Sequence, residues 1–382
     1  MERTLNENVI AWAAERSGLT DERLHRAFPK LNEWLDGSRK PTVNQLKALA
    51  KKLNIQLFEL FGEHLPDYAL QIPDFRTFED SGVKEPSPSL YDTVELMVRR
   101  QSWMRDFFLS EGYERVGIVG SFQRSSSVGG PRELARELYG WLGLEDDWAI
   151  HLRTYDEALR RLKDTIEGRG ISVAINGVVG DCTNRPLDID EFRGFALADD
   201  VAPLIFINGR DTKGAQIFTL VHELSHLALN QTGLSNPVED ELGSTDIERF
   251  CNATAAEFLV PNGLLMQEWH DADCACYDRV EHIARLHKVS FMVVARRLHD
   301  EGELADPDFF ALCHRHRAEA NKVVRGKGSG GDYYRTKRNK LGNVFSEAIL
   351  SAVTSGAITY RDAYELTNMK GSTFSKYYEG VA

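Results

Sequence analysis

The sequence lacks the features of an exported or membrane protein. It contains no run of about 18 apolar residues, and no apolar segment follows a basic start at its N-terminus. Its five cysteines are odd in number and follow no framework spacing, which argues against a set of structural disulfides. We therefore predict a cytoplasmic protein with reduced thiols and no membrane partner.

The chain also lacks an excess of positive charge, with 46 Lys and Arg residues against 58 Asp and Glu. The formal net charge of -12 argues against a protein that coats nucleic acid with its whole surface, so any nucleic-acid contact must be local. The apolar content of 42%, with 10% aromatic residues, is enough for a buried core, and 382 residues suggest two or three domains.

Hydrophobic periodicity and breaker residues predict an α+β protein that is mostly helical. A long helix is expected over 90–111, with Arg99, Arg100 and Arg105 on a solvated face. Two β-rich runs, GISVAINGVV and APLIFING, predict a small sheet on either side of the polar stretch 181–193. The predicted regions are a helical domain at 1–64, a linker and long helix at 65–130, a catalytic domain at 131–300 and a C-terminal helical region at 301–382 with a Gly-rich hinge at 326–331.

The most informative motif is HELSH at 222–226, inside the apolar segment IFTLVHELSHLALN. Residues four apart on a helix differ by about 40° in direction, so His222 and His226 can share one Zn²⁺. Glu223 is turned about 100° away, where it can act on a water molecule rather than bind the metal. Two histidines satisfied by ordinary hydrogen bonds are the structural alternative, which the apolar surroundings disfavour.

A hydrolytic zinc site needs a third protein ligand. Glu248 is the favoured choice because Asn252 follows it by four residues, the E-x-x-x-(D/N) arrangement of gluzincins, in which the second residue can support a ligand histidine. A capping box formed by Thr245 and Glu248 is the competing structural role. Glu257 is nine residues after Glu248, so the two cannot face the same metal. The other acidic residues considered are Glu239, Asp240, Glu241 and Asp246.

Three segments, EFRGFALADDVAPLIFING, QIFTLVHELSHLAL and ERFCNATAAEFLVP, resemble the ImmA/IrrE metallo-endopeptidases in sequence and in order. Cys251 and Thr254 stand where Ala and Phe are usual in that family. The resemblance, good over about 130–300, implies a zincin-like gluzincin core with one Zn²⁺ held by His222, His226 and Glu248. It also implies Glu223 as general base and a protein substrate that is often a transcriptional repressor.

The strand at Leu204–Asn208 could hold an extended substrate by edge pairing, or could be simple sheet structure. Cys182 and Cys251 raise a separate question, because either thiolate could block the open metal position and keep the enzyme latent. Packing is the alternative role for these cysteines.

The first 64 residues resemble an XRE-type helix-turn-helix domain whose recognition helix is shortened. Acidic and basic residues are nearly balanced there, and Pro29 interrupts the shortened stretch, so degenerate DNA reading and protein recognition are both left open. The basic C-terminal segment suggests a solvated hinge, with nucleic-acid contact as the alternative. Its basic residues are Arg315, Arg317, Lys322, Arg325, Lys327, Arg335, Lys337, Arg338 and Lys340.

Two hypotheses follow for function. The chain is a zinc-dependent endopeptidase that cleaves a cognate repressor or regulatory partner in a stress response, or it is a DNA- or partner-binding transcription regulator with a structural or vestigial zinc site. Glu223 favours the first hypothesis, because a purely structural zinc site has no need of a general base.

Overall fold

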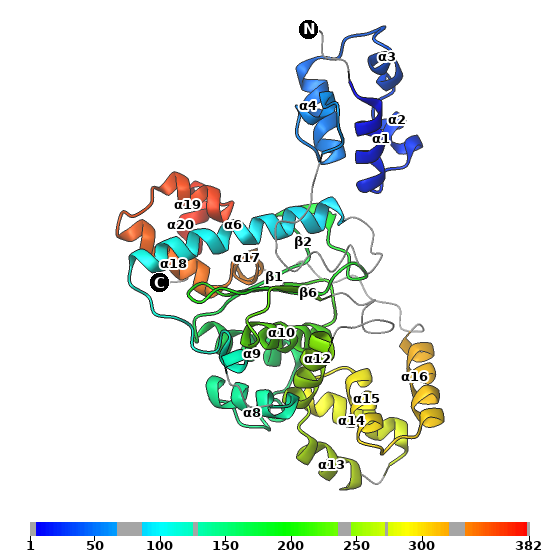
Figure 1. Cartoon of the computed structure of the whole chain (residues 1–382), viewed down its shortest axis with the longest axis vertical. Coiled ribbons are helices and arrows are strands. Elements are labelled where there is room, and N and C mark those ends of the chain that lie inside the picture. The colour runs from blue at the N-terminus through cyan, green and yellow to red at the C-terminus, as the bar shows by residue number, and fades with distance from the viewer. Residues whose placement is uncertain are drawn as a thin grey trace. The chain divides into compact units, whose positions relative to one another are not determined.

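The computed structural model describes residues 5–66, 86–124, 129–235, 246–271, 274–320 and 333–379 (Figure 1). The chain divides into two compact units, Met1–Glu95 and Leu96–Ala382. It is mostly helical with a small mixed sheet, which confirms the α+β class. The predicted hinge at 326–331 and most of the predicted linker, 67–85, lie outside the described residues. The boundaries of the four predicted regions stay predictions.

The N-terminal unit is a small helical bundle. Its helices α1 and α4 pack through a buried core that includes Val9, Leu49 and Leu53. Side-chain caps begin three of its helices, at Asn6, Thr20 and Thr42. The elements are α1 (Glu7–Arg16), α2 (Asp21–Ala27), α3 (Leu31–Leu35), α4 (Val43–Leu53) and the short 3-10 helix η1 (Glu59–Phe61).

Helix α3 stands where the sequence places a shortened recognition helix. It has only five residues, and its Leu31 and Trp34 side chains are buried in the bundle. The helix-turn-helix assignment stays a prediction, as does any DNA contact.

The sheet of the larger unit has the order β1-β5-β4-β6. Its strands are β1 (Ser172–Asn176), β4 (Gly194–Leu197), β5 (Leu204–Asn208) and β6 (Gly233–Ser235), and a separate hairpin joins β2 (Val178–Val179) to β3 (Cys182–Pro186). Strand β5 pairs with β1 in parallel and with β4 antiparallel. Because both of its edges are occupied, Leu204–Asn208 is simple sheet structure, and the edge-pairing expectation is wrong.

Helices cover both faces of this sheet. Figure 1 shows α6 (Pro88–Ser110) crossing one face, while α9 (Tyr155–Glu167) and α10 (Lys213–Ala228) lie under the other. On the α6 side, Gln101 Nε2 donates hydrogen bonds to the backbone oxygens of Leu197 and Ala202. On the α10 side, strand residues such as Ala196 and Ile207 share one core with the helix.

The remaining elements of the larger unit are helical. They are α7 (Ser121–Arg124), α8 (Pro131–Leu142), α12 (Asp246–Leu259), α13 (Asn262–Asp271), α14 (Cys276–His287), α15 (Phe291–Asp300), α16 (Asp306–Ala320), α17 (Tyr333–Leu341), α18 (Asn343–Thr354), α19 (Tyr360–Thr367) and α20 (Gly371–Glu379). Within the described ranges, no helix combines the length and apolar character needed to cross a membrane.

Helices α17 and α18 pack beside β1, and an ionic cluster joins α17 to the β2–β3 hairpin. Asp181 accepts hydrogen bonds from Lys337, from Lys340 Nζ (3.1 Å) and from Asn368 Nδ2 (2.9 Å). Lys337 is only 2% exposed. For these two lysines the solvated-hinge expectation is therefore wrong, and Asp181 already neutralises charge that a nucleic acid would otherwise meet. Lys322, Arg325 and Lys327 lie outside the described residues.

Two further contacts hold the same helices. Glu167 Oε1 accepts a hydrogen bond from the backbone N–H of Asn343 (2.7 Å) at the start of α18. Arg100 donates to the backbone oxygen of Lys340 (3.1 Å) and lies over the ring of Phe345. Arg100 is thus buried rather than on a solvated face, and burial lowers the pKa of its guanidinium to about 10.

Candidate metal centre

Helix α10 carries the HELSH motif through the interior of the larger unit. Thr212 caps its start by accepting a hydrogen bond from the backbone N–H of Ala215 (3.3 Å). Residues 219–228 are all buried, as expected of a helix that is apolar on most of its circumference. Four-residue spacing therefore brings His222 and His226 to one face of a fixed, buried helix.

Helix α12 packs against α10 and supplies Glu248. Phe258 anchors the opposite end of α12. Its ring stacks on Tyr139 of α8 with centroids 4.4 Å apart, and its backbone oxygen accepts a hydrogen bond from the Tyr139 hydroxyl. Burial raises the pKa of Tyr139, which keeps this hydroxyl protonated and able to donate. The α8–α12–α10 packing thus holds Glu248 against the two histidines.

The three predicted ligands converge. His222 Nε2 and His226 Nε2 are 3.0 Å apart, and each lies 3.2 Å from a carboxylate oxygen of Glu248. Ligand atoms bound tetrahedrally at 2.0–2.1 Å are separated by about 3.3 Å, so the spacing suits a small cation. Two imidazoles and a carboxylate also form a donor set that zinc accepts. The cluster could hold a metal ion.

The electrostatics of Glu248 agree with a ligand role. Burial alone would raise the pKa of this carboxyl, but hydrogen bonds from His222 and His226 outweigh burial and hold the pKa well below its usual range. Glu248 therefore stays ionised, as a metal-binding carboxylate must be.

The other acidic residues considered lie elsewhere. Glu257 is paired with Arg297 of α15 and lies 3.6 Å from Arg132 of α8, so it joins three helices instead of facing the histidines. Asp246 is exposed and paired with Arg249. Glu239, Asp240, Glu241 and the capping residue Thr245 lie outside the described residues.

Glu223 is fully buried and follows Thr219 by four residues on α10. Its neighbours include Gly194 of β4, a contact that sequence reasoning missed because the two residues are far apart in the chain. Asn252 is half-buried on α12, four residues after Glu248. The roles of Glu223 and Asn252 stay predictions.

Neither cysteine suspected of latency belongs to the described ligand cluster. Cys182 is exposed on β3. Cys251 is buried on α12, and burial, together with the nearby charges of Glu248 and Glu223, raises the pKa of its thiol. A protonated, buried thiol favours the packing role for Cys251. The latency hypothesis stays a prediction.

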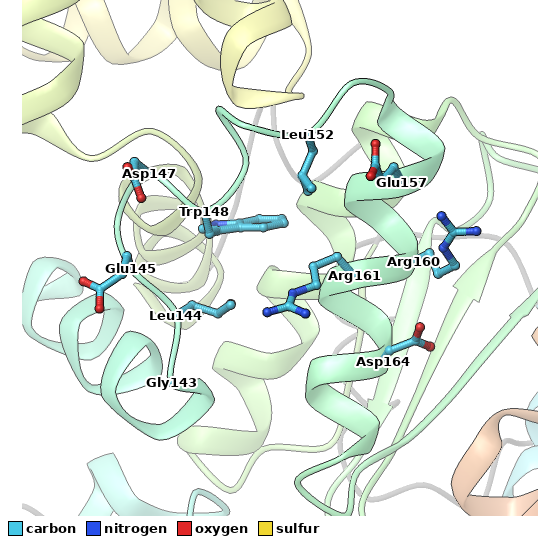
Figure 2. A pocket seen from close by; sticks show the side chains of 10 residues that line it. All are labelled: Gly143, Leu144, Glu145, Asp147, Trp148, Leu152, Glu157, Arg160, Arg161 and Asp164. Atoms are coloured by element: carbon cyan, nitrogen blue, oxygen red, sulfur yellow. The ribbon is translucent and has the colours of Figure 1, made fainter.

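A hollow of about 520 Å³ lies between α9 and the loop after α8 (Figure 2). Leu144, Trp148 and Leu152 form its apolar part. Arg161 extends from α9 toward Leu144 and Trp148. None of the clustered residues lines this hollow, so it is separate from the candidate metal centre.

Comparison with known proteins assigns two segments. Residues 341–380 match a family model described as a domain of unknown function (DUF8813), and these residues cover α18–α20. No curated protein matches the chain. Residues 183–299 match the peptidase family M78 model, described as the IrrE N-terminal-like domain. This segment contains His222, Glu223, His226 and Glu248, and the match supports its place in the ImmA/IrrE family as a metallopeptidase domain.

Proposed function

We propose that this chain is a zinc-dependent endopeptidase with one Zn²⁺ held by His222, His226 and Glu248. The observation that carries the proposal is the convergence of three ligand atoms within 4.8 Å of one another, inside a segment that matches a peptidase family. Glu223, next to the first histidine in the sequence, supplies the carboxylate that hydrolysis needs. Asn252 is proposed to support one of the ligand histidines.

Peptide hydrolysis requires a proton to move from water to the leaving amine. Glu223 accepts a proton from the attacking water as the new C–O bond forms, and later donates that proton to the amine nitrogen as the C–N bond breaks. When bound, zinc supplies Lewis acidity that polarises the carbonyl and makes water easier to deprotonate. The buried surroundings of Glu223 strengthen these electrostatic effects, because few water molecules screen them.

We further propose a regulatory protein, such as a transcriptional repressor, as the substrate. The resemblance to the ImmA/IrrE family supports this choice. The N-terminal unit is proposed to recognise that partner rather than DNA, because α3 is short and uses Leu31 and Trp34 for its own core.

The test compares the wild type with Glu223→Gln, a change that keeps size and hydrogen bonding but removes the base. Zinc content is measured by elemental analysis. Cleavage is followed on fluorescent casein and on repressors whose genes lie next to the gene for this protein. We expect one zinc in both proteins and a fall in cleavage of about 10²–10⁴-fold in Glu223→Gln.

Two results would overturn the proposal. A wild-type protein that binds no zinc would remove the metal centre. Zinc-loaded protein that cuts none of these substrates, or that cuts them equally well without Glu223, would point to a structural metal site.

A further inference from the structure

Strand β4 begins at Gly194, and the α-hydrogens of this glycine include one on the face of the sheet that packs against α10, where a side chain would project. Ala196 belongs to the core shared with α10, and side chains two apart on a strand point the same way. A side chain at position 194 would therefore point at α10. On that helix, Thr219 and Glu223 are four residues apart and face the strand together.

No space exists for that side chain. A Cβ atom at position 194 would lie 2.6 Å from Thr219 Cγ2, 2.9 Å from the backbone oxygen of Phe206 and 3.1 Å from Glu223 Oε1. Ordinary contacts between carbon atoms are about 3.5–4.0 Å. The first two distances are overlaps that require some atom to move, and the third is tighter than an ordinary contact. The Glu223 carboxylate thus lies close to the position that a β-carbon of residue 194 would take.

The surroundings decide what would move if this carbon were added. Phe206 belongs to β5, which is held by β1 on one side and β4 on the other, so its backbone oxygen cannot retreat easily. Thr219 and Glu223 both project from a buried helix. The added atom must push β4 and α10 apart, or displace the side chains of Thr219 and Glu223.

We propose that Gly194 is a positioning residue for Glu223. By lacking a side chain, it lets β4 approach α10 closely and leaves room for the Glu223 carboxylate in its observed position. The inference rests on the proposed function, because the position of Glu223 matters for turnover only if Glu223 is the base. A displacement of about 1 Å in such a group can cost about 10²-fold in rate.

The experiment compares Gly194→Ala with Gly233→Ala in the full chain. Gly233 lies on the neighbouring strand β6, and a Cβ there would meet its nearest atoms, in the ring of His226, at an ordinary 3.6 Å. For Gly194→Ala we expect about one zinc, a KM within threefold of the wild type and a kcat about 10²-fold lower. For Gly233→Ala we expect kcat and KM within threefold of the wild type.

Thermal unfolding gives a second reading that does not depend on activity. If the added carbon crowds Glu223, removing the Glu223 side chain should relieve the crowding. The double variant Gly194→Ala/Glu223→Ala should then have a higher Tm than the sum of the two single effects predicts. If Gly194→Ala does not fold, the pair Gly194→Ala/Thr219→Ser, which removes the closest overlapping atom, is measured instead.

The results separate the two proposals. A wild type that cuts nothing refutes the proposed function. In that case the Tm values of the single and double variants still test the contact between positions 194 and 223. Active wild type, inactive Glu223→Gln and a Gly194→Ala variant with unchanged kcat would overturn only the positioning role. A loss of zinc in proportion to the loss of kcat would also overturn it, since the change would then act on the metal.

Discussion

The candidate metal cluster can be compared with the C-terminal attachment, the ionic contact of Asp181 with Lys337 and Lys340 of α17. The two regions differ in how the chain brings their side chains together. His222 and His226 are four residues apart on one helix, and their Nε2 atoms lie 3.0 Å apart. Asp181 and Lys340 meet at 3.1 Å across 159 residues. The first pair is set by helix geometry alone, whereas the second exists only once the hairpin and α17 have packed. Variants in each of the two regions can test whether zinc binding and the stability of the C-terminal helices are independent.

The largest effect should come from His226→Ala. Removing one of the three proposed ligands should weaken zinc binding by about a thousandfold, because each ligand of such a site contributes several kcal/mol to binding. Competition with a chelator measures this affinity. Glu257→Gln is the matched control, since Glu257 lies on α12 with Glu248 but pairs with Arg297. Equal zinc affinity in His226→Ala and the wild type would show that the cluster is not the metal site.

Phe345→Ala should produce the next largest effect. We expect it to lower the stability of the fold without changing zinc binding. Phe345 is 1% exposed, and its ring meets Trp103 edge-on and lies under the Arg100 guanidinium. Loss of the ring should lower the free energy of unfolding by about 3–5 kcal/mol. Chemical denaturation measures the change. Zinc content should stay at that of the wild type, and a parallel loss of zinc would mean that the two regions are coupled.

Asp181→Asn should have the smallest effect, with a specific pH dependence. Partial burial would raise the pKa of Asp181, but the hydrogen bonds and charges of Lys337 and Lys340 outweigh burial and lower it. A carboxyl whose pKa is lower in the folded state stabilises the protein above its unfolded pKa of about 3.9, and loses that contribution as pH falls through the folded pKa. We expect a cost of about 2 kcal/mol at neutral pH.

Denaturation curves at several pH values check this expectation. The difference between the wild type and Asp181→Asn should shrink below about pH 4. Asp106→Asn, at an exposed position on α6, is the control and should leave stability unchanged at every pH. A constant difference across the pH range would show that the charge of Asp181 is not what stabilises the attachment.

The longer periodic elements were predictable. The helix expected over 90–111 is observed as α6, and the two β-rich runs contain β1 and β5. The short strands were not predicted, since β4 has four residues, β6 has three and β3 lies in a stretch interpreted as polar. Strands of this length carry too few side chains for a periodic pattern, and their pairing depends on partners elsewhere in the chain.

Burial of charge was the weakest part of the prediction. Arg100 and Lys337 were assigned to solvated surfaces because charged residues are mostly exposed, yet both are buried with partners far along the chain. No local pattern distinguishes such a residue from a solvated one.

The sequence by itself determined the relative directions of the His222, Glu223 and His226 side chains, because the geometry of an α-helix fixes the angle between residues of known spacing. The sequence favoured Glu248 over Glu257 as the third ligand, but only the tertiary structure brings the Glu248 carboxylate to the two histidines and places Glu223 close to a glycine of β4. It also decided that Asp181 binds the lysines of α17. Each of these contacts joins distant segments, and packing of whole helices and strands is what sets such distances.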